Sequence, residues 1–374
     1  MRYDLSDLPL SELLPALSQA EDMLARLDER VLRHAVADGF KERGHFFDSV
    51  AALWVGGELV HVEDLVLHDA HMDARAPTHE LTIAHAVLRA RRRLWNAEPA
   101  WGISPAGIAA IRGGAEGADD VVVPRPPSLQ TAEDAGEIGD EDEEEDSLAA
   151  EFAEIDAILA RSERALEAGA GISESRSAAT DVDPLGLVHD EEWDEEERLQ
   201  AWRNVIRDAD ALPPSLGAAI LFDAWERIEP LRRQHWMGSL LVSAYLRSRG
   251  KVTSHLFSLN VGLKSIRHER RRSRDGTLRL LAFLDAMTQA ADAGLKELDR
   301  LSLARSQMER RMKDRRSNSK LPGVIELILS RPIVSVNMVA RHVNVTARGA
   351  LNLVGELGVR EMTGRGRYRG WGVL

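Results

Sequence analysis

Apolar residues recur three and four positions apart through most of this 374-residue chain, and this helical spacing limits its fold more than any other feature. The pattern runs from Leu10 to Ala37 and returns over 46–70 and 78–95. We expect further helices over 103–112, 147–168, 191–211, 215–229, 231–249, 261–272 and 277–316, the last with one break. The sequence therefore predicts an all-α protein that is mainly helical.

Two stretches carry no amphipathic pattern and divide the helical segments. Residues 113–147 are rich in Gly, Pro and acidic side chains, which is typical of a disordered acidic linker. Its acidic run is expected to be solvated, although it also has the charge to mask a basic surface. A second linker is predicted over 169–190. These linkers predict an N-terminal helical domain over 1–112, a second helical domain over 148–320 and a third domain over 321–374.

Composition excludes several classes of protein. The chain has no cysteine, which rules out disulfides, iron–sulfur clusters, Cys-ligated zinc and thiol nucleophiles. It has neither a secretory N-terminus nor an apolar run of 18 residues, so we expect a cytoplasmic protein with no membrane contact. Behind the net charge of −13, residues 227–374 carry 29 basic and 12 acidic side chains, against 19 and 49 in residues 1–226. The C-terminal part is therefore basic and suits an anionic partner.

The last 54 residues follow the order helix, short helix, turn, helix. Pro322 stands in the first turn of the first helix, and Pro332 follows its end. Ser335 can cap the second helix, and Thr346 can cap a third helix that ends at Gly358. This order is typical of a helix-turn-helix.

After the third helix the sequence alternates around Thr363–Gly364–Arg365–Gly366, which predicts a β-hairpin with a glycine-rich tip. Such a hairpin is the wing of a winged helix, and this domain places its third helix in the major groove of double-stranded DNA. The candidate DNA-binding residues are Ser335, Thr346, Arg348 and Asn352 on the helices and Arg365, Arg367 and Arg369 on the wing. The alternative is a winged helix that serves only packing or dimerisation.

Two basic runs, a histidine-rich segment and four tryptophans also stand out in the sequence. The basic runs 267–274 and 310–316 are expected to add a positive field that holds phosphates. His68, His71, Asp73, His79 and His85 lie close in sequence, but their spacing matches no established metal motif, so we expect no metal and no other cofactor. Four tryptophans lie at helical positions among apolar residues, which predicts core packing: Trp193, Trp202, Trp225 and Trp236.

The segments GSLLVSAYLRSRG (238–250), LNVGLKSIRHERRR (259–272) and VREMTGRGRYR (359–369) resemble the C-terminal half of Fic family proteins. Those proteins transfer AMP from ATP to hydroxyl side chains, and many carry a winged helix after the catalytic helices. The segments 8–31 and 56–70 also look like the family's N-terminal helices. The resemblance implies a helical bundle over about two thirds of the chain.

The chain departs from the Fic family where the family's chemistry resides. Fic proteins need the motif HPFxxGNGR, in which the His is the general base and the glycine-rich loop holds the ATP phosphates. In that place this chain reads IEPLRRQHWMG, with Ile228 at the position of the His and Arg233, Gln234 and His235 in the phosphate loop. Gly56 stands where the family's inhibitory Glu would be. We therefore expect a degenerate Fic-like domain and not an enzyme.

The whole chain more closely resembles an uncharacterised bacterial family, frequent in rhizobia and often plasmid-borne, in which a domain of unknown function precedes a helix-turn-helix DNA-binding domain. The sequence thus predicts a sequence-specific transcriptional regulator. Its helical body is expected to form a homodimer or to receive a signal from a protein partner or a small-molecule effector. Two alternatives stay open: an AMP-transferring enzyme with an altered active site near His235, and a non-catalytic protein-interaction module.

Overall fold

A computed structural model describes residues 8–72, 76–116, 193–312, 320–363 and 369–373. The described residues before 117 and after 193 belong to one compact unit. Its first helices are α1 (Leu10–Leu32), α2 (Ala37–Gly56), α3 (Val62–Asp69), α4 (His79–Asn96) and α5 (Pro105–Glu116), with a short 3₁₀ turn, η1 (Trp101–Ile103), before α5. The predicted helix over 46–70 is therefore two helices, because the chain adopts a left-handed conformation at Gly57, with φ +97°.

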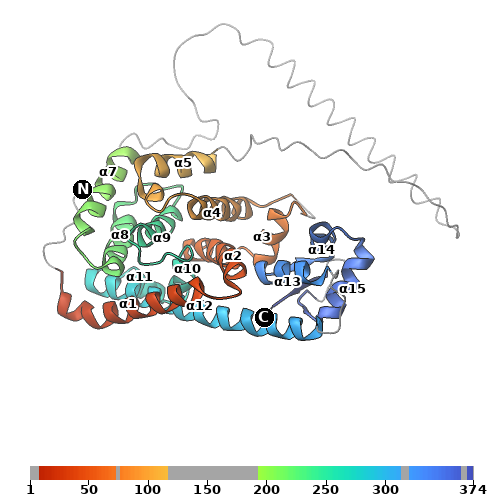
Figure 1. Cartoon of the computed structure of the whole chain (residues 1–374). Helices are drawn as coiled ribbons and strands as arrows, with labels where there is room; N and C mark the ends of the chain where they lie inside the picture. Colours follow the sequence, from red (N-terminus) through yellow and green to blue (C-terminus); the bar gives the residue numbers. More distant parts are fainter. Residues whose placement is uncertain (1–7, 73–75, 117–192, 313–319, 364–368, 374) are drawn as a thin grey trace, which may run out of the picture. The chain divides into compact units, whose positions relative to one another are not determined.

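The second part of the unit contains α7 (Glu195–Ala209), α8 (Pro214–Ile228), α9 (Met237–Ser248), α10 (Leu259–Leu263), α11 (His268–Arg271) and α12 (Gly276–Met312). Helix α12 has 37 residues and is about 55 Å long. It is continuous, so the predicted break is wrong, whereas the single helix predicted over 261–272 is divided into α10 and α11. Figure 1 shows α12 running along the unit beside α1.

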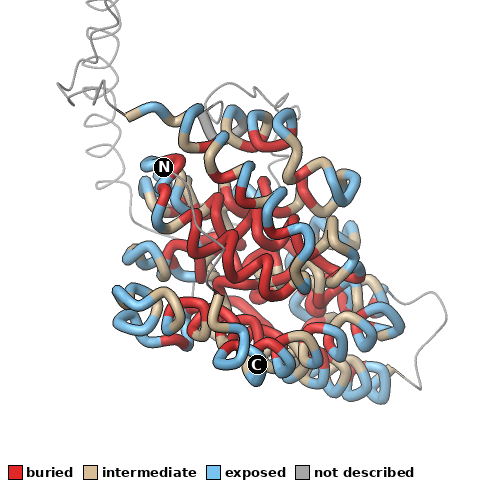
Figure 2. Tube along the Cα trace, turned by 90° about the vertical axis from the view of Figure 1, so that its left-hand side faces the viewer, coloured by how far each residue is buried: buried red, intermediate tan, exposed pale blue. Residues whose placement is uncertain are grey.

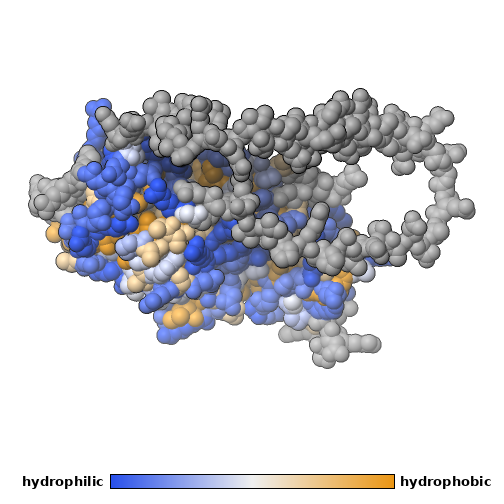
Figure 3. All heavy atoms as spheres, turned by 90° about the horizontal axis from the view of Figure 1, so that it is seen from above, coloured by the Kyte–Doolittle hydropathy of each residue, from blue (hydrophilic) through white to orange (hydrophobic). Residues whose placement is uncertain are grey.

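The core lies among α8, α9 and the helices packed on them. Both helices are buried along almost their whole length, and Figure 2 shows buried residues filling the interior. Trp202 and Trp225 meet edge to face with ring centroids 5.3 Å apart, and the indole N–H of Trp202 donates to the carbonyl of Leu221 at 2.9 Å. The predicted core role of these two tryptophans is confirmed. The described surface in Figure 3 is mostly hydrophilic.

Buried charges join the helices of the core. Asp48 on α2 and Arg91 on α4 form an ion pair whose side chains are each 1% exposed. Asp48 also accepts hydrogen bonds from the backbone and side-chain N–H groups of Asn260, at 2.8 and 3.1 Å. A second buried pair, Asp223 and Arg279, links α8 to α12 at 2.5 Å. The core is therefore held in a fixed register by specific polar contacts as well as by apolar packing.

The C-terminal segment contains α13 (Leu321–Ser330), β1 (Val334–Ser335), α14 (Val336–Val343), α15 (Ala347–Leu357), β2 (Arg360–Glu361) and β3 (Gly370–Gly372). The three strands form an antiparallel sheet in the order β1-β3-β2, with Trp371 of β3 opposite both Val334 and Glu361. The predicted fold class is confirmed: the protein is all-α, with a C-terminal helix-turn-helix that carries a small hairpin.

This C-terminal segment packs directly on α2. A Cβ atom at Gly39 would lie 2.8 Å from the carbonyl oxygen of Leu329, so α2 and α13 approach each other as closely as glycine permits. The buried guanidinium of Arg43 donates to the carbonyl oxygens of Arg331 at 2.6 Å and Val373 at 3.3 Å. The predicted domain boundaries stay predictions, but in the described residues these segments share one core.

Substitution Gly39→Val is expected to lower the free energy of unfolding by about 1–3 kcal/mol, because the added carbon atoms must push α13 away from α2. Chemical denaturation of the full chain measures this change. Gly56→Val in the same helix is the matched control, since a Cβ atom there meets nothing within 4 Å. Equal stability of the two variants would contradict the close packing of α13 on α2.

No helix in the described part of the chain is both long and apolar enough to cross a membrane.

Candidate nucleic-acid interface

Hydrogen bonds at the two helix starts fix the geometry of the helix-turn-helix. The Ser335 hydroxyl accepts from the backbone N–H of Met338 at 3.3 Å, and the Thr346 hydroxyl accepts from that of Gly349 at 3.2 Å. Asn344 ends α14 in a left-handed conformation, with φ +51°, which reverses the chain between α14 and α15. The predicted capping roles of Ser335 and Thr346 are confirmed. Their predicted contact with DNA stays a prediction.

Helix α15 presents one face to solvent and buries the other. Ala350, Val354 and Leu357 are buried. The exposed positions are Ala347, Arg348, Leu351, Asn352, Gly355 and Glu356. Arg348 and Asn352 are one helical turn apart on this exposed face, as the sequence predicted, and they lie near the N-terminal half of α15.

Leu351 was not among the predicted site residues, yet it is 38% exposed between Arg348 and Asn352. The signal was present in the sequence, because position 351 falls outside the apolar stripe formed by 350, 354 and 357. The exposed face therefore offers a guanidinium, an amide and an apolar group in adjacent positions. These groups suit guanine, adenine and the thymine methyl group, respectively.

In the hairpin, Arg369 contacts the opposite strand. Its guanidinium donates to the Glu361 carboxylate from Nε at 3.0 Å and from Nη2 at 2.6 Å, and it lies 5.2 Å from the centroid of the Trp371 ring. The pairing lowers the pKa of Glu361 and raises that of Arg369. Arg369 therefore links the two sides of the hairpin, and its predicted contact with DNA stays a prediction. Arg365 and Arg367 lie outside the described residues.

The second basic run contributes to the position of α15. Arg311 at the end of α12 donates from Nη1 to the carbonyl oxygen of Leu357 at 2.6 Å, and its cationic group complements the negative end of the α15 dipole. Gly358, with φ +57°, leaves room for this guanidinium, because a Cβ atom there would overlap it. Residues 313–316 of the run lie outside the described residues. The end of α15 is thus fixed to α12.

The first basic run lies elsewhere. Arg270 pairs with Asp285 near the start of α12 at 2.7 Å, whereas Arg311 is at its C-terminal end. About 40 Å of helix separates Asp285 from Arg311. Figure 1 shows α11 and α15 at opposite ends of α12. The two basic runs therefore lie far apart along α12, and residues 267–274 are not next to α15.

Two of the histidines near α3 make contacts within the protein. His68 and His85 meet edge to face at 4.7 Å, and His85 Nε2 lies 3.4 Å from Asp69. Asp69 also accepts from Arg92 at 2.6 Å. Asp73 is outside the described residues. Among the residues that are described, no group of three or more His, Asp or Glu side chains has the arrangement of a metal site.

The loop between α8 and α9 contains the residues that the sequence analysis set against the Fic motif. Ile228 is buried at the end of α8, and Arg233 and His235 are exposed in the loop. Gln234 donates to the carbonyl oxygen of Arg112 at 3.4 Å. Gly238 follows in α9, where the Trp225 ring occupies the space of a Cβ atom. This part of the chain therefore has bulky side chains where a phosphate loop needs small ones.

The fold and the exposed face of α15 define a helical protein that ends in a helix-turn-helix DNA-binding domain. A family model described as "HTH DNA binding domain" matches residues 321–374, and one described as "Protein of unknown function (DUF1612)" matches residues 187–313. The chain is 44% identical over 384 residues to the uncharacterized protein y4cF of Sinorhizobium fredii, with the full length of both chains covered. It therefore belongs to the same family as that protein, and in this chain the DUF1612 match precedes the helix-turn-helix match.

Proposed function

We propose that this protein is a sequence-specific transcriptional regulator that reads double-stranded DNA with the exposed face of α15. The observation that carries the proposal is the grouping of Arg348, Leu351 and Asn352 on one solvent-facing helix surface. Arg348 forms no ion pair with any described residue, so its guanidinium is available for a base edge or a phosphate.

We further propose that the helical body is a Fic-like domain without catalytic activity, which forms a homodimer or receives a signal. Ile228 cannot act as a general base, and Arg233 and His235 replace small loop residues. Calorimetric titration with ATP and magnesium tests the loss of nucleotide binding. Binding of ATP, followed by transfer of AMP to protein, would instead support an altered enzyme with His235 near its site.

The test of the regulatory function is selection of bound fragments from genomic DNA by the purified full-length protein. Recovery of a shared sequence motif is expected, and a two-fold dimer predicts that the motif is palindromic. The same affinities are then measured over a series of salt concentrations. Fragments with no common motif, or an affinity that does not change with salt, would contradict the proposal.

Charge reversal at the hairpin tip, Arg365→Glu with Arg367→Glu, is expected to weaken binding to all DNA sequences to a similar degree. Each phosphate contact that is lost lowers the dependence of log K on log salt by about 1. Fluorescence anisotropy with one selected and one unrelated duplex measures both effects. Arg369→Ala is the comparison variant. Because the Glu361 carboxylate already binds the Arg369 guanidinium, we expect a smaller loss of affinity than in the double variant. Unchanged affinity in the double variant would show that the hairpin does not act as a DNA-binding wing.

A further inference from the structure

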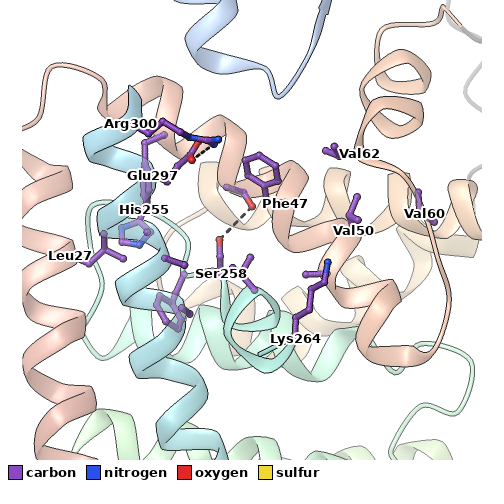
Figure 4. A pocket seen from close by; sticks show the side chains of 18 of the residues that line it. Leu27, Phe47, Val50, Val60, Val62, His255, Ser258, Lys264, Glu297 and Arg300 are labelled. Carbon is purple, nitrogen blue, oxygen red and sulfur yellow. Dashed lines mark hydrogen bonds and ion pairs between the residues drawn. The ribbon is translucent and has the colours of Figure 1, made fainter. Parts of the chain in front are cut away.

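A cavity of about 510 Å³ lies between α2 and α12 and is bordered by α10 and the segment before α3. Its size is that of pockets that bind drug-sized molecules. Most of its lining is apolar, and Ala290, Ala293 and Gly294 of α12 are small enough to leave the space open. Figure 4 shows Leu27, Phe47, Val50 and Val60 around it.

One lining residue, His255, is a buried polar group whose hydrogen-bonding state can be assigned. Its side chain is 4% exposed, and its Nδ1 lies 2.9 Å from the Ser254 hydroxyl oxygen. That hydroxyl donates its only proton to the Asp28 carboxylate at 2.7 Å. It must therefore accept from Nδ1–H, which leaves Nε2 of the neutral ring as an acceptor. Burial lowers the pKa of His255 to about 4, so the ring is neutral near pH 7.

The acceptor Nε2 has no hydrogen-bond partner among the described protein groups. The His255 ring is flanked by two other aromatic rings, Phe40 at 5.5 Å and Phe257 at 6.5 Å between centroids. A buried acceptor without a donor lowers stability, because it gives up its bond to water. Because His255 lines the cavity, its unpaired nitrogen points to a ligand that brings a donor of its own.

The charged residues of the lining are two acidic and two basic side chains, Glu63 and Glu297 with Lys264 and Arg300, so their formal charges cancel. Glu297 accepts from Arg43 Nε at 2.7 Å and also pairs with Arg300. A ligand that enters the cavity therefore needs no charged group to balance the charges of these side chains. A neutral donor, such as a hydroxyl, suits the neutral acceptor of His255.

We propose that this cavity binds a neutral, mostly apolar small molecule that carries a hydroxyl group, and that the hydroxyl donates to His255 Nε2. We also propose that its binding changes the affinity of α15 for DNA. The second part rests on the proposed function, whereas the first part does not.

The contacts of Arg43 provide the physical connection between the cavity and the helix-turn-helix. Glu297 lines the cavity and holds Arg43, and Arg43 donates to the carbonyl oxygens of Arg331 and Val373 next to α13 and β3. The walls α2 and α12 are also the helices on which α13 and α15 rest. We infer that a ligand that favours one spacing of these walls also favours one position of the DNA-binding helices.

Binding is tested by calorimetry on the full chain with two probes, 2-naphthol and 2-methoxynaphthalene. The probes share an apolar body, but only 2-naphthol can donate a hydrogen bond. We expect 2-naphthol to bind at least tenfold more tightly to the wild type. His255→Phe should abolish this preference and retain weak binding of both probes. His61→Phe, which alters another lining residue, should keep the preference.

Blocking the cavity provides a second, independent test. Ala293→Phe fills the space and should reduce the affinity for both probes at least tenfold, with thermal melting used to confirm that the variant folds. Equal affinity of the wild type for the two probes, or no binding of either up to its solubility limit, would overturn the ligand site. Undiminished binding to the filled variant would place the probes elsewhere.

The regulatory part is tested by measuring DNA affinity with and without saturating 2-naphthol. A change of at least fivefold is expected in the wild type. Arg43→Lys should keep probe binding, because Arg43 does not line the cavity, but should reduce this change, because one ammonium cannot reach Glu297 and both carbonyl oxygens as the guanidinium does. Probe binding with unaltered DNA affinity would overturn the coupling and leave the site intact. If the protein binds the probes but selects no DNA motif, the proposed function is refuted and the ligand site is not.

Discussion

Arg91→Met is expected to lower the free energy of unfolding by about 3–5 kcal/mol, because it leaves the buried carboxylate of Asp48 without its cation. Burial already raises the pKa of Asp48, and Arg91 opposes that effect. The substitution also leaves the carbonyl oxygens of Leu256 and Phe257 without the donors that reach them at 3.0 and 3.2 Å. Urea denaturation of the full chain at pH 7 measures the loss.

Arg89→Met is the matched control for this prediction. Arg89 lies on the same helix, α4, but is exposed, so the same change of side chain should alter the free energy of unfolding by less than about 0.5 kcal/mol. The double variant Asp48→Asn with Arg91→Met should lose less than the two single variants combined, since the unpaired charge is removed. A loss below about 1 kcal/mol in Arg91→Met would mean that the pair does not hold α4 against α2.

Arg348→Ala combined with Asn352→Ala is expected to weaken binding to a selected DNA site about hundredfold or more. Each side chain that reads a base contributes about 1–3 kcal/mol of discrimination. Because both residues are on the exposed face of α15, their truncation should leave the free energy of unfolding nearly unchanged. Anisotropy titrations at one fixed salt concentration, with the selected site and a scrambled duplex, measure affinity and specificity together.

A control for that variant removes the same kinds of group far from α15. Gln19→Ala with Arg26→Ala takes one amide and one cation from exposed positions of α1 and should leave DNA affinity within about twofold, since surface charges beyond the Debye length are screened. If both double variants bind the selected site as the wild type does, α15 is not the recognition helix. In that case Leu351→Ala, on the same face of α15, should also leave the sequence preference unchanged.

The helix-turn-helix was predictable because its determinants are local. Ser335 and Thr346 cap helices within three residues, and Gly358 ends one through its own backbone conformation. The periodicity of apolar residues was likewise sufficient to predict an all-α fold. The number of helices in 46–70 and 261–272 was less predictable, because short breaks at Gly57 and around 264–267 hardly disturb a helical pattern.

The contacts that position the site were not predictable from spacing. Arg91 stands in the run RARRR, which looks like an exposed basic face, yet its partner Asp48 is 43 residues away. Arg43 reaches Val373 across 330 residues. The His255 acceptor depends on Asp28, which lies far away in the sequence and fixes the tautomer through Ser254. Such long-range pairs leave no periodic signal, since each arises from how whole helices pack.

Because Arg311 contacts the end of α15, the number of residues in α12 sets the distance and the rotation between the earlier part of α12 and the helix-turn-helix. Each added residue would turn the following part of a helix by about 100° and advance it by 1.5 Å. A one-residue insertion between Glu297 and Arg311 would thus carry the guanidinium off the face that meets Leu357, while Glu297 kept its place beside Arg43. Functional variants of this chain are expected to tolerate insertions in loops far better than within this part of α12.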